Sequence, residues 1–278
     1  MSSTDRYAVI GEHIEHSRSP QIHALFAQAT GQDMHYGLID VPAAGFASVV
    51  REFFNRGGRG LNVTVPHKQA AVPLADTLTA RARRAGAVNT LALAPPGSAA
   101  DTVLGDNTDG AGLVRDLTVN LGCPLRGSRV LLLGAGGAAR GLIAPLLESG
   151  VESLLIQNRD SERANLLVRE FADLGPVGAA LGSTRVSPPY GLIINATSAS
   201  LRGEVPPIPQ GALDAKTLCY DCAYGEQDTV FVNWARAAGA ARAVMGLGML
   251  VEQAAESFLL WRGVRPDTAP VLKALRSL

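Results

Sequence analysis

Short apolar runs alternate with longer amphipathic stretches along the chain, and the two patterns predict different elements. The short runs have the length and apolar content of β-strands, whereas the longer stretches repeat apolar residues at helical spacing. Strands are predicted at residues 6–10, 60–65, 88–94, 129–133, 153–157, 191–195 and 217–221. Helices are predicted at residues 20–30, 138–149, 161–173, 248–262 and 269–278. This alternation is typical of an α/β fold.

The regularity of the pattern changes along the chain and indicates two domains. From residue 127 a short strand, a glycine turn and a helix follow one another repeatedly, whereas the segment before residue 105 is less regular and richer in polar turns. We place the domain change near Asp109, and we expect the apolar C-terminal helices to return to the first domain. The predicted domains are residues 1–108 plus 246–278, and residues 109–245.

Composition and charge exclude several classes of protein. The chain has 278 residues with 25 Lys plus Arg and 25 Asp plus Glu, so its formal net charge is zero, which is not typical of a nucleic-acid-binding protein. No uncharged apolar run reaches the ~18 residues of a membrane helix. The N-terminal segment lacks the apolar core of a signal peptide, and three cysteines do not form a disulfide scaffold. The sequence therefore predicts a soluble cytoplasmic protein. It does not indicate the oligomeric state, for which a monomer and a homodimer both stay open.

A glycine-rich loop directly follows the predicted strand at residues 129–133. The loop reads G-x-G-x-x-A, and its residues are Gly134, Ala135, Gly136, Gly137, Ala138 and Ala139. The first glycine allows a tight turn, the second lets the backbone approach a pyrophosphate, and the small last residue lets the helix pack closely on the strand. The helix N-terminus adds N–H donors and a positive partial charge. The loop predicts a bound dinucleotide, and a structural turn of the same fold is the alternative.

The residues after the next predicted strand bear on which dinucleotide binds. An acid here would hold both ribose hydroxyls of NAD, whereas Asn158 followed by Arg159 and Arg163 suits the 2′-phosphate of NADP. Asp160 complicates this choice, because its carboxylate could repel the phosphate, hold a bare ribose, or cap the following helix. NADP is the predicted cofactor, and NAD remains a weaker alternative.

Polar segments of the first domain follow its predicted strands. Ser19 followed by Pro20 is typical of a helix start with serine as the N-cap, and Ser17 and Ser19 together could also hold a carboxylate. Lys68 is expected in the first turn of a second helix, which Pro66 starts. Further side chains that can bond hydroxyl groups are Thr64, Asn89, Thr90, Asn107 and Asp109. Each residue has a structural explanation by itself, but together they predict a site for a small polyhydroxylated carboxylic acid.

Eight segments form ordered motifs that span nearly the whole chain. They are HSRSPQIH, NVTVPHK, GAVNT, GDNTDG, GAGGAAR, NRDSER, NATS and GLGMLVEQAAESFLLWRGV. In composition and order they resemble the shikimate/quinate dehydrogenase family. The resemblance implies an N-terminal α/β substrate domain with a mixed sheet, completed by the C-terminal helices, and a Rossmann-type domain that binds NADP. It also implies the reversible NADPH-dependent reduction of 3-dehydroshikimate to shikimate, a step of aromatic amino acid biosynthesis.

The resemblance further implies roles for individual residues. Lys68 and Asp109 match the family's catalytic pair. The matches to its substrate-binding residues are Ser17, Ser19, Thr64, Asn89, Tyr224 and Gln253. The matches to its cofactor contacts are Gly134, Ala135, Gly136, Gly137, Ala138, Asn158, Arg159, Arg163, Thr197, Gly246 and Met249. Oxidising a ring alcohol needs a hydride acceptor, which nicotinamide supplies, and a proton acceptor, which the pair supplies. The sequence leaves open which member of the pair moves the proton.

Two other functions remain in view. One is a quinate/shikimate or other paralogous dehydrogenase with a different choice of cofactor and substrate, which Asp160 keeps open. The other is a non-catalytic dinucleotide sensor on the same scaffold. The presence of both Lys68 and Asp109 argues against a sensor, which has no need of the pair.

No metal site is predicted from the cysteines and histidines. Cys219 and Cys222 form one C-x-x-C on a predicted strand, where residues three apart point to opposite faces. We expect no partner acids or cysteines to cluster with His13 and His16 in the fold, so a metal site there is not predicted. His23 and His67 are interpreted as hydrogen-bonding residues of the scaffold.

Overall fold

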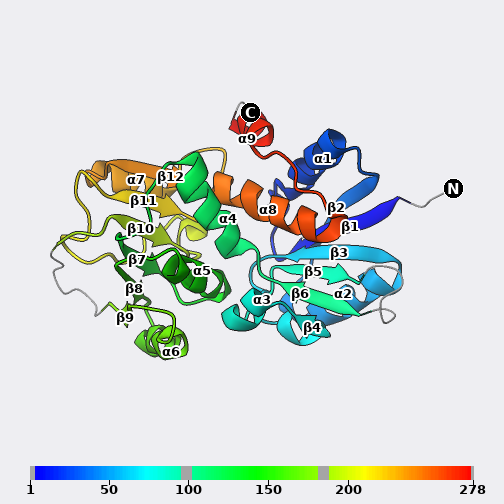
Figure 1. Cartoon of the computed structure of the whole chain (residues 1–278), viewed down its shortest axis with the longest axis horizontal. Helices are drawn as coiled ribbons and strands as arrows, with labels where there is room; N and C mark the ends of the chain where they lie inside the picture. The colour runs from blue at the N-terminus through cyan, green and yellow to red at the C-terminus, as the bar shows by residue number, and fades with distance from the viewer. Residues whose placement is uncertain (1–3, 95–101, 181–187, 277–278) are drawn as a thin grey trace. The chain divides into compact units, whose positions relative to one another are not determined.

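The computed structural model describes residues 4–94, 102–180 and 188–276, which form two compact units (Figure 1). Unit 1 spans residues 1–112 and 250–278, and unit 2 spans residues 113–249. Each boundary lies four residues further along the chain than expected (112 against 108, and 249 against 245). As a result Asp109, the first residue of α4 (Asp109–Arg115), falls in unit 1 together with Lys68.

Unit 1 is built on a mixed sheet. Its strands are β1 (Asp5–Gly11), β2 (Met34–Asp40), β3 (Gly58–Val63), β4 (Thr77–Leu78), β5 (Thr90–Leu93) and β6 (Val103–Asp106). Their order is β2-β1-β3-β5-β6-β4, with β5 antiparallel to both neighbours and the other pairs parallel. Its helices are α1 (Ser19–Thr30), α2 (Phe46–Asn55), α3 (Ala80–Ala85), α9 (Ala269–Arg276), the start of α4, and most of α8 (Leu247–Arg262).

Both faces of the unit 1 sheet are covered. Successive side chains of a strand point to opposite faces, and β1 shows this directly. Ala8 and Ile10 belong to a buried cluster that includes the apolar residues of α2, whereas Tyr7 and Val9 belong to a second cluster, against which Trp261 of α8 packs. The prediction that C-terminal helices return to the first domain is therefore confirmed for α8.

Unit 2 contains a parallel sheet. Its strands are β7 (Arg129–Leu133), β8 (Ser153–Gln157), β9 (Val177–Ala179), β10 (Leu192–Asn195), β11 (Leu218–Asp221) and β12 (Arg242–Met245). Their order is β9-β8-β7-β10-β11-β12, and all neighbours are parallel. The chain adds β8 and β9 on one side of β7 and then β10, β11 and β12 on the other, so the order of the strands reverses between β7 and β10. This is the doubly wound Rossmann order, in which ligands bind beyond the carboxyl ends of the strands at the reversal. The predicted fold class is confirmed.

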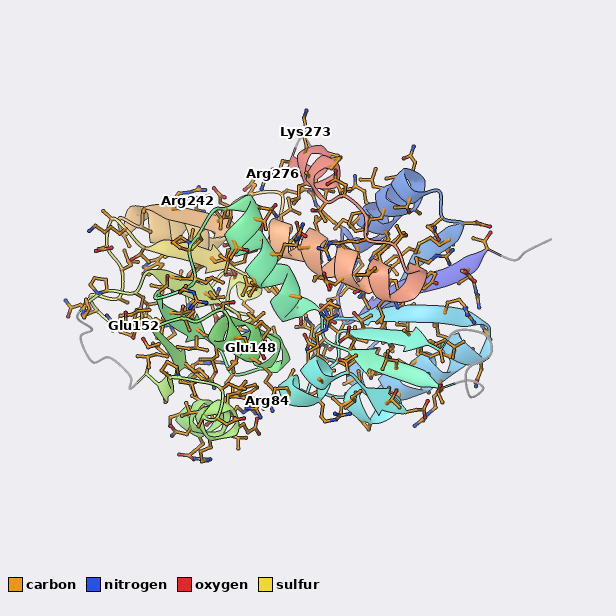
Figure 2. All side chains as sticks on the ribbon, in the orientation of Figure 1. Arg84, Glu148, Glu152, Arg242, Lys273 and Arg276 are labelled. Carbon is orange, nitrogen blue, oxygen red and sulfur yellow. The ribbon has the colours of Figure 1, made fainter. Side chains whose placement is uncertain are left out.

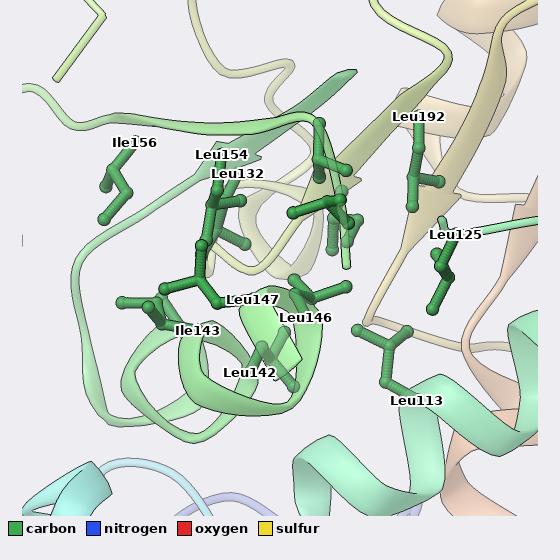
Figure 3. Packing of buried hydrophobic residues seen from close by; sticks show 14 of the residues in the cluster. Leu113, Leu125, Leu132, Leu142, Ile143, Leu146, Leu147, Leu154, Ile156 and Leu192 are labelled. Carbon is green, nitrogen blue, oxygen red and sulfur yellow. The ribbon is translucent and has the colours of Figure 1, made fainter. Parts of the chain in front are cut away.

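Helices pack on both faces of this sheet. They are α5 (Gly137–Glu148), α6 (Ser161–Phe171) and α7 (Val230–Ala237). Figure 3 shows side chains of α5 gathered against those of the strands. Leu142, Ile143, Leu146 and Leu147 come from α5, and Leu132, Leu154, Ile156 and Leu192 come from β7, β8 and β10. On the opposite face, Leu131 and Leu133 share a cluster with Phe231 of α7. The switch point between β7 and β10 is thus held by an apolar core on either side.

Charged side chains lie at the surface of both units. Figure 2 labels Glu148, Glu152 and Arg242 in unit 2, and Lys273 and Arg276 on α9 in unit 1, and all five are exposed. Within the described residues, every helix is too short or too polar to cross a membrane.

Two local predictions are wrong. Ser19 is the first residue of α1 and not its N-cap: the N-cap is Arg18, whose helical backbone (φ −85°, ψ −1°) differs from the extended one that side-chain capping uses. Residues 66–71 form turns and no helix. The 3-10 helix η2 (Val72–Leu74) follows directly, and Pro73 disfavours α-helical backbone at Val72, so these turns do not extend into an α-helix. Lys68 consequently lies in a turn.

Candidate active site

Lys68 and Asp109 form a hydrogen-bonded ion pair inside unit 1. Lys68 Nζ lies 2.6 Å from Asp109 Oδ2, and the two side chains are only 11% and 5% exposed. Lys68 comes from the turn that follows β3, and Asp109 begins α4 just after β6. Because most of the surrounding water is excluded, this charge-assisted bond is stronger than a surface ion pair.

The other carboxylate oxygen of Asp109 is also occupied. Asn89, which precedes β5, donates from Nδ2 to Asp109 Oδ1 at 2.9 Å and to Thr108 Oγ1 at 2.8 Å. The amide oxygen of Asn89 accepts from the backbone N–H of Thr108 at 2.8 Å. Asn89 is therefore held in one orientation, and Asp109 is held by a cation on one oxygen and an amide on the other.

Gln253 of α8 completes this cluster. Its Nε2 donates to the backbone carbonyl of Leu250 at 2.8 Å, which directs Oε1 towards Asn89 Nδ2 and Thr108 Oγ1, each at 3.3 Å. The structure thus brings together Lys68, Asn89, Asp109 and Gln253, four of the predicted site residues, from four separate elements of unit 1.

Ser17, Ser19 and Thr64 lie beyond the carboxyl ends of the two neighbouring parallel strands β1 and β3. Ser17 Oγ accepts from the backbone N–H of Ser19 at 3.3 Å, and Ser19 is buried at the start of α1. Thr64 donates its backbone N–H to Ile10 O at 2.9 Å, and its methyl group packs so near Gly11 that a Cβ there would approach within 2.4 Å. Within the described residues, no hydrogen bond joins these three side chains to the Lys68 cluster.

A buried carboxylate that the sequence did not single out stabilises the part of the cluster around Asn89. Asp106, at the end of β6, accepts from Arg81 at 2.5 and 2.7 Å and from Thr79 at 2.6 Å. Burial alone would raise the pKa of Asp106, but these bonds and the guanidinium charge hold it below its ordinary value. The backbone carbonyl of Asp106 accepts the N–H of Asn89 at 3.0 Å, so this carboxylate fixes the strand end that presents Asn89.

In unit 2, the glycine loop follows β7 at the switch point of the sheet. Gly134 has φ +111°, and a Cβ there would lie 3.1 Å from Ala196 O, at the end of β10. Gly136 is the N-cap of α5, and a Cβ built on it meets no described atom within 4 Å. No side chain of the described residues caps α5, so its first N–H groups keep their hydrogen-bonding capacity for a ligand.

The segment after β8 settles how Asp160 is used locally. Asp160 is the N-cap of α6 and accepts from the N–H groups of Glu162 (3.0 Å) and Arg163 (3.3 Å). Arg163 Nε lies 3.3 Å from Asp160 Oδ2, with both side chains more than half exposed. Asn158 Nδ2 donates to the backbone carbonyl of Asp160 at 2.9 Å. The capping interpretation of Asp160 is confirmed, and Arg159 remains exposed beside it.

The loop after β10 carries Thr197. It is fixed by Asn195, and Asn195 is held by Asp221, a residue that sequence reasoning missed. Asn195 Oδ1 accepts from both the backbone N–H and the hydroxyl of Thr197, at 3.1 and 2.7 Å. Asn195 Nδ2 in turn donates to Asp221 Oδ1 at 3.1 Å. Asp221 is fully buried; burial raises its pKa, against the opposing effect of the hydroxyls of Ser200 and Thr229 that donate to it. The signal for Asp221 in the sequence was an acid at the end of a predicted strand, residues 217–221.

Gly246 and Met249 flank the start of α8. A Cβ on Gly246 would lie 2.6 Å from Cys222 O, so this turn packs tightly on the end of β11. The backbone N–H of Met249 donates to the hydroxyl of Tyr220 at 3.2 Å, and that hydroxyl donates to Asp116 Oδ2 at 2.7 Å. Burial and Asp116 raise the pKa of Tyr220 well above its ordinary value, so it stays a donor.

Three of the other sequence interpretations are resolved by the structure. His67 is confirmed as a hydrogen-bonding residue of the scaffold, with Nε2 2.9 Å from Val41 O. The same interpretation of His23 is wrong, because neither of its buried ring nitrogens has a hydrogen-bond partner among the described residues. Cys219 is buried in β11, its thiol is free, and burial raises its pKa to about 12. Tyr224 is half-buried just beyond the same strand.

The expectation that no acids cluster with His13 is wrong. Ligand atoms of His13, Glu15 and Asp40 all lie within 4.8 Å of one another, because the turn after β1 meets the end of β2. All three residues are exposed, and Asp40 already accepts the backbone N–H groups of His13 and Ile14. This contact accounts for the cluster as a turn-stabilising arrangement.

Taken together, the fold and these residues define a class of two-unit α/β proteins, with a doubly wound sheet in one unit and a buried ion-paired polar cluster in the other. Comparison with known families is specific. Residues 9–91 match the shikimate dehydrogenase substrate binding domain, residues 118–199 match shikimate / quinate 5-dehydrogenase, and residues 246–276 match the shikimate 5'-dehydrogenase C-terminal domain. The chain belongs to the shikimate dehydrogenase family.

Individual relatives cover nearly the whole chain. The protein named shikimate dehydrogenase (NADP(+)) from Alkalilimnicola ehrlichii is 57% identical over 98% of this chain and 99% of its own length. The protein of the same name from Methylococcus capsulatus is 54% identical over 100% and 98%. The solved structure of shikimate 5-dehydrogenase from Thermus thermophilus in complex with NADP(H) and shikimate is 32% identical, with a TM-score of 0.85 over 98% and 99% of the two chains.

Proposed function

We propose that this chain catalyses the reversible NADPH-dependent reduction of 3-dehydroshikimate to shikimate. The observation that carries the proposal is the buried ion pair of Lys68 and Asp109, with the oriented amides of Asn89 and Gln253 beside it. Side-chain amides offer both donors and acceptors to ring hydroxyls, and the ion pair can exchange a proton with one of them. The names of the relatives support the same substrate and cofactor.

Within the pair, we assign the proton exchange with substrate to Lys68. Both oxygens of Asp109 already accept hydrogen bonds, one from Lys68 and one from Asn89. An ammonium group has three N–H donors, and a single one is used towards Asp109, which leaves others for a substrate oxygen. In this assignment Asp109 fixes the position of Lys68 and balances its charge. During reduction the ammonium gives one of its N–H protons to the carbonyl oxygen of the substrate as the hydride reaches the ring carbon. Oxidation requires the neutral amine, formed when the ammonium releases a proton to solvent, and this amine accepts the hydroxyl proton.

The residues of unit 2 fit a dinucleotide. Open space above Gly136 and uncapped N–H groups at the start of α5 suit a pyrophosphate. Arg159 and Arg163 suit a 2′-phosphate. The further proposed contacts are Gly134, Ala135, Gly137, Ala138, Asn158, Thr197, Gly246 and Met249. When bound, the nicotinamide of NADP(H) supplies the hydride donor or acceptor.

The carboxylate of the substrate is assigned to hydroxyl groups. Ser17 and Ser19 lie at the N-terminal end of α1, where the helix dipole favours an anion and no side chain of the described residues caps the helix. Thr64 contributes from the end of β3, and Tyr224 is a further substrate contact that the family resemblance implies. The ring hydroxyls are assigned to Asn89 and Gln253.

A spectrophotometric assay tests the proposal. Purified protein is expected to reduce NADP with shikimate, giving absorbance at the wavelength of the reduced nicotinamide, and to run in reverse with 3-dehydroshikimate and NADPH. Parallel assays with quinate, and with NAD, distinguish a paralogous dehydrogenase with different substrate or cofactor choice. Absence of turnover with both substrates and both cofactors would overturn the proposal and favour a sensor.

A further inference from the structure

We propose that Thr90 is a positioning residue for this site, and that a buried hydrogen-bond chain from β3 and α8 orients it. The inference rests on the proposed function and adds to it a residue that has no assigned contact with substrate or cofactor. Thr90 is the first residue of β5 and is fully buried.

The hydroxyl of Thr90 holds the oxygen side of the Asn89 amide. Thr90 Oγ1 donates to Asn89 Oδ1 at 2.9 Å, and the backbone N–H of Thr108 donates to the same oxygen at 2.8 Å. An amide oxygen has two lone pairs, and these are its two closest donors; the hydroxyl of Thr108 lies further away, at 3.2 Å. Two bonds fix the amide plane where one would let it swing. The opposite end of the amide therefore stays aligned on Asp109 Oδ1, 2.9 Å away.

The proton of the Thr90 hydroxyl is directed by groups behind it. Asn62 Nδ2 donates to Thr90 Oγ1 at 3.2 Å and to Ser257 Oγ at 2.9 Å. Ser257 Oγ lies 2.8 Å from Thr90 Oγ1, and its hydroxyl also donates to the backbone carbonyl of Gln253 at 3.1 Å. Because the amide oxygen of Asn89 can only accept, the Thr90 hydroxyl gives its single proton to that bond, and the Asn62 N–H fills one of its lone pairs.

The hydrogen-bond chain begins at a tyrosine hydroxyl in β2. Tyr36 of β2 donates to Asn62 Oδ1 at 2.7 Å, which orients the Asn62 amide so that Nδ2 faces Ser257 and Thr90. Tyr36, Asn62, Thr90 and Ser257 are all buried. Buried networks in which every member is satisfied specify a single arrangement of their groups. Here that arrangement ends at the carboxylate that fixes Lys68.

The test replaces Thr90 with valine, which keeps the shape of the side chain and removes the hydroxyl, and with serine, which restores it. We expect Thr90→Val to lower kcat about tenfold, because small misplacements of catalytic groups are costly. The KM for NADP should be unchanged. The solvent deuterium isotope effect on kcat should rise, because proton transfer becomes more nearly rate-limiting. Thr90→Ser should return both quantities towards the parent, and Ser257→Ala, which leaves the Thr90–Asn89 bond in place, should change them less.

Thr217→Val serves as a matched control, since Thr217 is also fully buried and its hydroxyl donates to Tyr190 O at 2.7 Å in unit 2. A mere loss of stability would reduce the active fraction in both valine variants and leave the isotope effect at its parent value. Parent turnover with an unchanged kcat and isotope effect in Thr90→Val would overturn the inference. An inactive parent would instead overturn the proposed function.

Discussion

Lys68 is the single residue on which the proposed chemistry depends most. Lys68→Ala removes the group that exchanges the proton, and general acid–base groups typically contribute about 10²–10⁴-fold. We expect kcat to fall by a factor in that range, with a much smaller change in the KM for shikimate, because the group acts mainly in the transition state. Steady-state kinetics in the direction of shikimate oxidation measure both constants.

Lys216→Ala is the matched control, because Lys216 is exposed in unit 2 and lies outside every proposed contact. It should leave both constants unchanged. If Lys68→Ala raised KM alone and left kcat intact, Lys68 would be a binding residue and the catalytic assignment would be wrong.

The second prediction for a single residue concerns Asp160 and the preference for NADP over NAD. Its carboxylate lies 3.3 Å from Arg163 and competes with a 2′-phosphate for that guanidinium. Exposed pairs of this kind contribute ~0.2–1 kcal/mol, so Asp160→Thr should raise the ratio of kcat/KM for NADP to that for NAD only a few-fold. Threonine can also cap a helix, so α6 should persist.

Arg159→Ala provides the opposite test, since it removes an exposed cation without disturbing the cap, and it should lower the same ratio. Both ratios come from initial rates at low cofactor concentration. An unchanged ratio in Asp160→Thr would show that the carboxylate acts as a cap alone. A parent protein that prefers NAD would show that Asp160 holds a bare ribose.

At the scale of elements, the β7–loop–α5 segment gives a prediction in which binding and stability separate. Gly136→Ala should lower the affinity for NADP and leave the unfolding free energy nearly unchanged, because its φ of −89° suits alanine and its Cβ meets no described protein atom. Gly134→Ala should lower both, since its φ is +111° and its Cβ would crowd Ala196. Isothermal titration and urea unfolding measure the two quantities. Equal affinity in Gly136→Ala and the parent would argue against a pyrophosphate at this loop.

How well the sequence predicted each element follows from how local its causes are. The strands β7 and β8 have the bounds predicted for them, because each is a short buried apolar run ended by turn residues. By contrast β2 was not predicted, since it is half-exposed and its burial follows no clean alternation. The edge strands β4 and β9 are only two and three residues long. Their existence depends on pairing with neighbours that no local pattern reveals.

The candidate site was predictable residue by residue but not as an arrangement. The glycine loop carried its own physical explanation, whereas the pairing of Lys68 with Asp109, 41 residues apart, came from the family resemblance. From the sequence, Thr90 could be named only as one of several side chains able to bond a hydroxyl group, and Ser257 was assigned no role, because a buried hydroxyl gives no sign of its partner. Those partners lie in strands and helices that only the folded sheet brings together.

For the molecule as a whole, His23 makes the free energy of unfolding depend on pH. Its ring is fully buried and stacks on Tyr36 at 4.1 Å, and burial lowers its pKa from 6.5 to about 3, against an opposing effect of Asn62. Below pH 6.5 His23 of the unfolded chain therefore binds a proton, whereas His23 of the folded chain does not bind one until about pH 3. The stability that the neutral ring allows is complete above pH 6.5 and is lost progressively as the pH falls through that window.

This loss should amount to as much as about 1.4 kcal/mol for each pH unit below 6.5. His23→Phe keeps an aromatic ring against Tyr36 and cannot take up the proton, so its unfolding free energy should fall less between pH 7.5 and pH 5 than that of the parent. The difference between the two proteins should be about 2 kcal/mol in urea unfolding followed by circular dichroism. His16→Gln, which removes an exposed histidine, should retain the parent's pH dependence. Equal slopes in His23→Phe and the parent would show that the acid sensitivity between pH 7.5 and pH 5 comes from groups other than His23.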